Sequence, residues 1–103
     1  MIEFQEGFHI YYIYILTKKA KTVFYTGVTN HLKIRLSQHK ENVNPQSFTS
    51  KYNVHYLLYY EKFTWIQEAI AREKEIKGWR REKKLDLIKT LNPHLEFLNS
   101  LFE

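Results

Sequence analysis

The sequence contains no cysteine and little glycine or proline, with 3 Gly and 2 Pro among 103 residues. Without cysteine the chain forms no disulfide bond, thiolate zinc site or thiol nucleophile, which fits a reducing cytoplasm. The low Gly and Pro content excludes a linker or low-complexity chain. No apolar run approaches the ~20 residues of a membrane span, and the first six residues are acidic where a secretory signal would be basic. We therefore expect a cytoplasmic protein without a membrane segment.

Aromatic and basic residues are abundant instead. The chain has 8 Tyr, 7 Phe and 2 Trp, and its formal net charge is +5. Aromatic side chains bury large areas, which suits the core of one small domain that has no disulfide bonds. A small basic protein commonly binds nucleic acid or another polyanion. Composition thus predicts one globular domain with a polyanion as a candidate partner.

Runs of β-branched and aromatic residues predict three strands, at residues 11–16, 22–26 and 56–60. Polar residues 17–21 suit a hairpin loop, so we expect the first two strands to pair in antiparallel fashion. Gly27 is expected to end the second strand.

Helical patterns predict three helices, at residues 32–40, 65–77 and 80–91. Thr29 or Asn30 can cap the first helix, and Thr64 can cap the second. Gly78 suits the position after the second helix, and Pro93 ends the third.

The order strand–strand–helix–strand–helix–helix predicts a mixed α/β fold, in which helices cover a short sheet. We divide the chain into an N-terminal arm at residues 1–9, a domain at 10–95 and a C-terminal tail at 96–103. Residues 42–49, which include Pro45, are expected to form a loop inside the domain.

Most of the positive charge lies near the end of the domain. Residues 72–89 contain eight basic and four acidic side chains, a net charge of +4. One interpretation is a solvated helix face with pairs such as Glu73 and Lys77, and charge alone slightly favours it. The alternative is a strip that faces phosphate groups.

Glu73 lies in line with the apolar residues of its helix, three positions after Ile70 and three before Ile76. Carboxylates are rarely buried unless they are paired or bind a metal ion. Glu73 is therefore either a residue at the rim of the helix, paired with a basic neighbour, or a functional carboxylate.

Arg35 and His39 lie one helical turn apart on one helix face, close to a strand–glycine–helix junction. Arginine offers a fork matched to phosphate, and histidine can move protons near neutral pH, although an exposed polar face is the simpler interpretation. Tyr14 and Tyr25 lie inside the paired strands, where tyrosines commonly pack. Either would need a lowered pKa, from nearby positive charge, to act as an acid or base at pH 7.

In this order the residues resemble the GIY-YIG nuclease domain. The resemblance covers roughly residues 10–95 and is closest to the small single-domain branch of the superfamily. It rests on Tyr12-Ile13-Tyr14, Tyr25-Thr26-Gly27-Val28-Thr29-Asn30, Arg35, His39, Ser47-Phe48-Thr49-Ser50-Lys51-Tyr52, Ala69-Ile70-Ala71-Arg72-Glu73-Lys74, Trp79 and Leu91-Asn92-Pro93. Two positions depart from the family motifs: Tyr12 replaces the first glycine and Thr26 replaces an isoleucine.

The resemblance implies a three-stranded antiparallel sheet flanked by helices, and metal-dependent hydrolysis of a phosphodiester. Glu73 would be the sole protein ligand of one Mg²⁺ or Mn²⁺ ion, and Tyr25 would be the base for the attacking water. The phosphate would be surrounded by Tyr14, Arg35 and His39, and Asn92 would match a late polar residue of the family.

We therefore predict a metal-dependent endonuclease that cuts DNA with structural or weak specificity and acts in DNA repair, with RNA as an alternative substrate and a protein partner as a source of specificity. Two other interpretations are a nucleic-acid-binding module with weak or no catalysis and a protein-interaction module. The residues expected to bind nucleic acid are Lys51, Arg72, Arg80, Arg81, Lys83 and Lys84.

Overall fold

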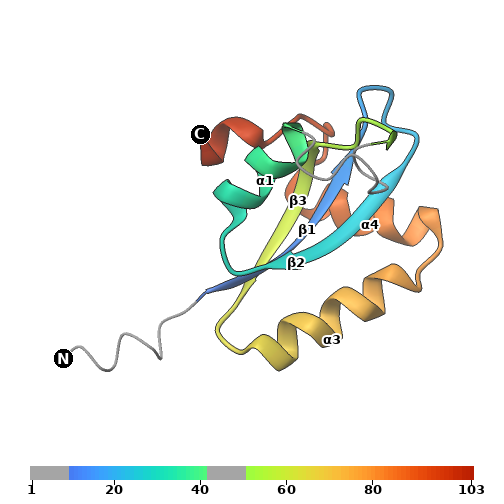
Figure 1. Cartoon of the computed structure of the whole chain (residues 1–103). Coiled ribbons are helices and arrows are strands. Elements are labelled where there is room, and N and C mark those ends of the chain that lie inside the picture. The colour runs from blue at the N-terminus through green and yellow to red at the C-terminus, as the bar shows by residue number, and fades with distance from the viewer. Residues whose placement is uncertain (1–9, 42–50) are drawn as a thin grey trace.

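The computed structural model describes residues 10–41 and 51–103 and shows a three-stranded antiparallel sheet packed against helices (Figure 1). β1 (Tyr11–Thr17) is the central strand, between β2 (Phe24–Thr29) and β3 (Tyr56–Phe63). The expected mixed α/β fold and order of elements are confirmed. The arm at 1–9, the loop at 42–49 and the motif residues 47–50 fall outside the described residues.

Gly27 lies inside β2 rather than at its end, which corrects the expectation from sequence. In the register of the sheet Gly27 pairs with Tyr14 of β1. A Cβ atom on Gly27 would lie only 2.5 Å from Cζ of the Tyr14 ring, closer than real side chains approach. Glycine therefore makes room for the Tyr14 side chain over the neighbouring strand.

The side chains of β1 alternate between two apolar clusters, one on each face of the sheet. Ile13 and Ile15 pack with Ala69, Ile76 and Ile88, and all five are fully buried. These partners come from α3 (Ile66–Lys77) and α4 (Arg81–Leu91), which therefore cover one face of the sheet.

The other face of β1 contributes Tyr14 and Leu16, which pack with Leu32 and Leu36. Both leucines belong to α1 (Leu32–Lys40), whose bounds agree with the expected helix at 32–40. Ile13 and Ile15, on either side of Tyr14 in β1, thus face the layer of α3 and α4, whereas the Tyr14 ring faces the layer of α1.

The helix ends differ from expectation in their chemistry. The side chain of His31 caps α1 by accepting a hydrogen bond from the Ile34 N–H group at 3.4 Å. Thr29 does not cap the helix itself; its hydroxyl accepts a hydrogen bond at 3.1 Å from the N–H group of the capping residue His31. α3 begins after Trp65 without a side-chain cap, so Thr64 does not fill the expected role. Gly78 ends α3 with φ of −80°, a conformation open to other residues.

The C-terminal residues expected to form a tail pack on the α1 face of the sheet and include a short 3-10 helix, η2 (Asn99–Phe102). The Leu98 N–H donates to the Leu57 carbonyl at 2.8 Å, and Asn99 Oδ1 accepts the Leu57 N–H at 2.8 Å. The Phe102 ring meets the Tyr12 and Tyr60 rings edge-on. In the described part of the chain, no helix is long and apolar enough to cross a membrane.

Candidate active site

Tyr14 lies at the centre of a polar cluster between β1 and α1. The ring is fully buried, and its hydroxyl accepts a hydrogen bond from Arg35 Nε at 3.4 Å. The same hydroxyl lies 3.1 Å from His39 Nε2. Because Arg35 and His39 are one turn apart on α1, the helix presents both side chains to one tyrosine.

The pKa of Tyr14 is raised to about 12, chiefly by burial and in part by Tyr25 and Glu73, against the opposing effect of Arg35. Tyr14 therefore keeps its proton at neutral pH. A protonated hydroxyl can donate one hydrogen bond, so it accepts from Arg35 and donates to His39.

Burial, together with electrostatic repulsion from Arg35 and His55, lowers the pKa of His39 to about 4. The imidazole is thus neutral at pH 7. With Nε2 accepting from the Tyr14 hydroxyl, we assign the proton of the neutral ring to Nδ1.

Tyr25 completes an aromatic group with Tyr14 and His39. Its ring centroid lies 6.5 Å from that of Tyr14 and 5.9 Å from that of His39. Unlike Tyr14, the Tyr25 side chain is only partly buried. The structure therefore brings together the two tyrosines of the paired strands and the two polar residues of α1.

Glu73 enters from α3, and only 13% of its side chain is exposed. Ala69 and Ile76 on either side are fully buried, whereas Ile70 is 38% exposed. The buried stripe of α3 thus runs through the carboxylate rather than through Ile70. Glu73 Oε2 accepts from Lys77 Nζ at 2.8 Å, and its charge contributes to the raised pKa of Tyr14. Glu73 is therefore both an ion-pair partner and a neighbour of the tyrosine cluster.

Asn92 stands apart from this cluster. It is buried at the end of α4, where its Nδ2 donates to the carbonyls of Leu58 at 3.0 Å and Glu96 at 2.7 Å. Its Oδ1 accepts the Glu96 N–H at 3.0 Å. These contacts connect the turn after α4 to β3, a positioning task that the resemblance does not suggest, so a catalytic role for Asn92 stays a prediction.

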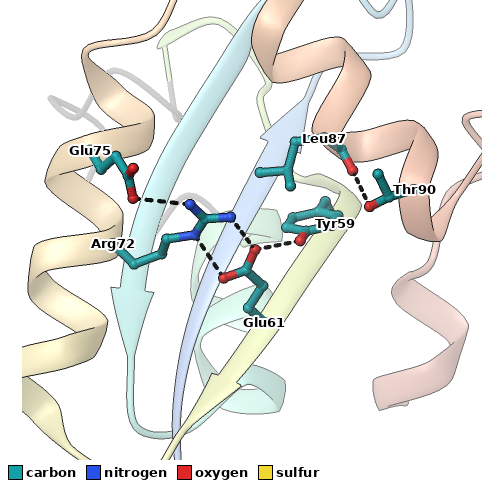
Figure 2. A network of polar contacts seen from close by, with 6 residues as sticks. All are labelled: Tyr59, Glu61, Arg72, Glu75, Leu87 and Thr90. Atoms are coloured by element: carbon teal, nitrogen blue, oxygen red, sulfur yellow. Dashed lines mark hydrogen bonds and ion pairs between the residues drawn. The ribbon is translucent and has the colours of Figure 1, made fainter.

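Arg72 is held in a polar network between α3 and β3 (Figure 2). Its Nε and one terminal nitrogen each donate to Glu61 at 2.9 Å, and the other terminal nitrogen donates to Glu75 at 3.0 Å. The Tyr59 hydroxyl also donates to Glu61. Because all three guanidinium nitrogens donate to carboxylates, nucleic acid would compete with this network for Arg72, and its predicted contact with nucleic acid stays a prediction.

Arg81 is also engaged within the fold, because its terminal nitrogens donate to the carbonyls of Thr22 and Lys21 at 2.5 and 3.0 Å. The Lys83 ammonium lies 4.4 Å from the centre of the Trp79 ring. Three more basic residues are predicted to bind nucleic acid. Lys51 and Arg80 are exposed, and Lys84 is partly buried.

The contact of Gly27 with Tyr14 does not follow from the sequence, which predicts Gly27 only as the end of a strand. The pair of Glu73 and Lys77 does follow from their one-turn spacing, and the structure contains it. The pair differs from a solvated one because its carboxylate is nearly buried.

The donor set fits one hard divalent ion. Mg²⁺ is commonly held by one or two carboxylates, with water and phosphate oxygens as the other ligands. Glu73 supplies one such carboxylate, and it already attracts a cation in the form of Lys77. Within residues 10–41 and 51–103, no group of three acidic or histidine side chains forms a cage for a metal ion.

Comparison with known proteins gives a consistent result. A family model described as the GIY-YIG catalytic domain matches residues 10–86. A UPF0213 protein of Staphylococcus haemolyticus is 33% identical over 78 residues, which cover 76% of this chain and 93% of the relative. A UPF0213 protein of Staphylococcus aureus strain Mu50 is 34% identical over 79 residues, covering 77% and 94%. The solution NMR structure of a UPF0213 protein from Bacillus halodurans aligns with a TM-score of 0.54 at 26% identity, covering 88% of this chain and 93% of that one.

Proposed function

Because the chain belongs to the GIY-YIG nuclease family, together with its UPF0213 relatives, we propose that it is a divalent-metal-dependent endonuclease that hydrolyses phosphodiester bonds of DNA. One observation carries the proposal: Tyr14, Arg35 and His39 form a hydrogen-bonded cluster within electrostatic range of Glu73. A stable core needs neither an arginine on a buried tyrosine nor a carboxylate in an apolar stripe.

Arg35 is the residue that would bind the phosphate. Only its Nε donates to Tyr14, and one terminal nitrogen donates to Gln38 at 3.3 Å, so several N–H groups remain for an anion. The residue is exposed, which leaves these donors accessible to a substrate. Tyr14 fixes the guanidinium in place, so the fork is positioned before the charge of the transition state develops.

Tyr25 is our candidate for the base that takes the proton of the attacking water. Tyr14 is a poor candidate, because its pKa of about 12, raised chiefly by burial, keeps the hydroxyl protonated at neutral pH. Tyr25 is partly exposed, lies against His39, and is within electrostatic range of Arg35 and Lys77. His39, which hydrogen-bonds the Tyr14 hydroxyl and lies against the Tyr25 ring, would be a proton relay beside this base.

Glu73 would hold the Mg²⁺ or Mn²⁺ ion. When bound, the ion supplies Lewis-acid stabilisation of charge on the departing oxygen. The carboxylate is suited to this task because its position is set by packing between Ala69 and Ile76.

The substrate we propose is DNA that is branched, damaged or otherwise recognised by structure. The net charge of +5 favours a polyanion through contacts that carry no sequence information. A protein partner would then supply further specificity in the cytoplasm.

The test is nicking of supercoiled plasmid by the purified protein in Mg²⁺ or Mn²⁺, with chelator as the control. We expect the wild type to nick the plasmid only when the divalent ion is present. Glu73→Gln should abolish nicking by more than about a hundredfold, because the amide lacks the anionic charge that a hard cation requires. The variant should keep the circular dichroism spectrum of the wild type. A Glu73→Gln protein that nicks as well as the wild type would remove the proposed metal site.

A further inference from the structure

The ion pair between Glu73 and Lys77 joins two side chains of very different exposure. Lys77 Nζ donates to Glu73 Oε2 at 2.8 Å. The lysine side chain is 52% exposed, whereas the glutamate is 13% exposed. The ammonium group can therefore leave at little cost, because it lies at the end of a flexible, half-exposed chain, while the carboxylate stays in place.

The surroundings of Lys77 hold a second cation. Lys84 of α4 is partly buried and forms no ion pair with any residue that the structure describes. Burial lowers the pKa of Lys84, and the positive charge of Lys77 lowers it further, so the two lysines are electrostatic neighbours. Tyr25 lies within range of Lys77 as well. Lys77 thus pairs with Glu73, lies within electrostatic range of Tyr25, and has a second positive charge in Lys84 nearby.

A purely stabilising role explains only part of this arrangement. A Glu–Lys pair one turn apart on a helix contributes a few tenths of a kcal/mol, and Glu before Lys is the favourable order. Such a pair forms equally well when both residues are exposed, as surface pairs usually are. Here the carboxylate instead takes a position in the apolar stripe between Ala69 and Ile76, and the lysine follows it.

We propose that Glu73 holds the Lys77 ammonium in the free protein and that, when a divalent ion binds Glu73, Lys77 moves to a phosphate oxygen of the DNA. The inference rests on the role that we propose for Glu73. Before the ion binds, Lys77 would balance the negative charge of Glu73. After the ion binds, Lys77 and Lys84 would bind DNA phosphate beside Tyr25. Removal of Lys77 should therefore have opposite effects on the binding of the ion and of DNA.

The first measurement is Mn²⁺ binding to the free protein, followed by electron paramagnetic resonance. Lys77→Ala should tighten Mn²⁺ binding about threefold to fivefold, the range expected when a half-exposed competing cation is lost. Lys74→Ala is the matched control, because Lys74 is an exposed lysine of the same helix without an ion pair among the described residues. It should change Mn²⁺ binding by less than about twofold.

The second measurement is the affinity for a short DNA duplex, read by fluorescence anisotropy in Ca²⁺ and again in chelator. In Ca²⁺, Lys77→Ala should weaken binding about tenfold, as expected for the loss of one charge-assisted hydrogen bond to phosphate, and Lys74→Ala should weaken it about twofold at most. In chelator, where Glu73 holds Lys77, the two variants should bind alike.

Either of two results would overturn the inference. One is equal Mn²⁺ affinity in Lys77→Ala and Lys74→Ala. The other is a Ca²⁺-independent loss of DNA affinity in Lys77→Ala, which would make Lys77 an ordinary surface contact. Neither measurement depends on cleavage, so failure of the proposed nuclease activity would show in plasmid nicking while the role of Lys77 is still decided here.

Discussion

The two faces of the sheet use charged side chains in opposite ways. On the α1 face, Arg35 touches a buried tyrosine at 3.4 Å and keeps free donors at the surface. On the face covered by α3 and α4, Arg72 forms a bidentate pair with Glu61 at 2.9 Å and spends its third nitrogen on Glu75. One terminal nitrogen of Arg35 donates to no described residue, whereas all three guanidinium nitrogens of Arg72 donate to carboxylates. Arg35 is therefore the better placed of the two to bind a ligand, and Arg72 joins α3 to β3.

The pKa shift of the Glu61 carboxyl contrasts with those of Tyr14 and His39 on the α1 face. Burial acts to raise the pKa of Glu61, but the hydrogen bonds from Arg72 and Tyr59 outweigh it, so the carboxylate is charged and its pKa is lowered. On the α1 face, burial prevails: the pKa of Tyr14 rises to about 12 and that of His39 falls to about 4. Groups kept neutral beside a cation suit proton transfer and anion binding, whereas a compensated ion pair suits stability.

The largest effect that separates the two faces is expected for the activity of Arg35 variants. Arg35→Ala should lower the rate of plasmid nicking by about 10²–10³, the range for loss of a transition-state donor, and leave the free energy of unfolding within about 0.5 kcal/mol. Arg35→Lys should be almost as inactive, because lysine keeps the charge but lacks the planar fork. Nicking rates and urea midpoints provide the test, and a Lys variant with most of the activity would reduce Arg35 to a source of long-range charge.

Gly27→Ala should produce the largest loss of stability. Its Cβ would meet the Tyr14 ring, which is fixed by Arg35 and His39, so we expect a loss of about 2–3 kcal/mol from overpacking, together with lower activity. Gly78→Ala is the control, because a Cβ atom at Gly78 would lie 3.6 Å from its nearest neighbour, the Glu75 carbonyl oxygen, which is an ordinary contact distance. Urea unfolding measures both variants. Equal stability of the two would show that Tyr14 can shift away without cost.

Arg72→Ala should reverse the pattern of Arg35→Ala. The free energy of unfolding should fall by about 1–3 kcal/mol, because Glu61 stays partly buried without its partner. The nicking rate per folded molecule should change by less than about threefold, because Arg72 lies in the structural network (Figure 2). Unfolding and nicking are measured on the same preparation, and Glu75→Ala, which removes the more exposed contact, serves as the milder control. A stable but inactive Arg72→Ala protein would place Arg72 in the active site.

The smallest expected effect is the dependence of stability on pH through His39. Its folded pKa of about 4 lies below the usual 6.5, so the neutral ring contributes stability above pH 6.5 that is lost as pH falls toward 4. The full pKa difference would correspond to about 3 kcal/mol, but the His39 ring is only partly buried and solvent screens it, so we expect the wild type to lose on the order of 1 kcal/mol more than His39→Gln over this interval. Urea midpoints at several pH values give the difference, with His94→Gln, at an exposed position, as the control. Parallel curves for wild type and His39→Gln would show that the ring is protonated as readily as in the unfolded chain.

Local patterns predicted the fold because each element has a signal within a few residues. Alternating aromatic and β-branched residues mark β1, and the bounds of α1 at Leu32–Lys40 agree with the helical pattern. The ends of β2 and β3 were harder to predict, since both strands continue past the expected residues to Thr29 and Phe63. Strand length depends on the partner strand that supplies hydrogen bonds, and that partner is distant in sequence.

The candidate site likewise has features that local sequence patterns predict and features that depend on distant residues. The helical spacing of Arg35 and His39, and the position of Glu73 in an apolar stripe, follow from periodicity, which sequence alone determines. Arg35 and Arg72 carry the same charge, and the sequence does not tell which of them can still bind a ligand. The fold decides this, because β1 brings a tyrosine to Arg35 and β3 brings a carboxylate to Arg72. The fold likewise placed Gly27 against Tyr14 and used Asn92 to fasten the chain after α4. Burial and hydrogen bonding between residues far apart in the chain set these outcomes and the pKa values that accompany them, so only the tertiary structure could decide them.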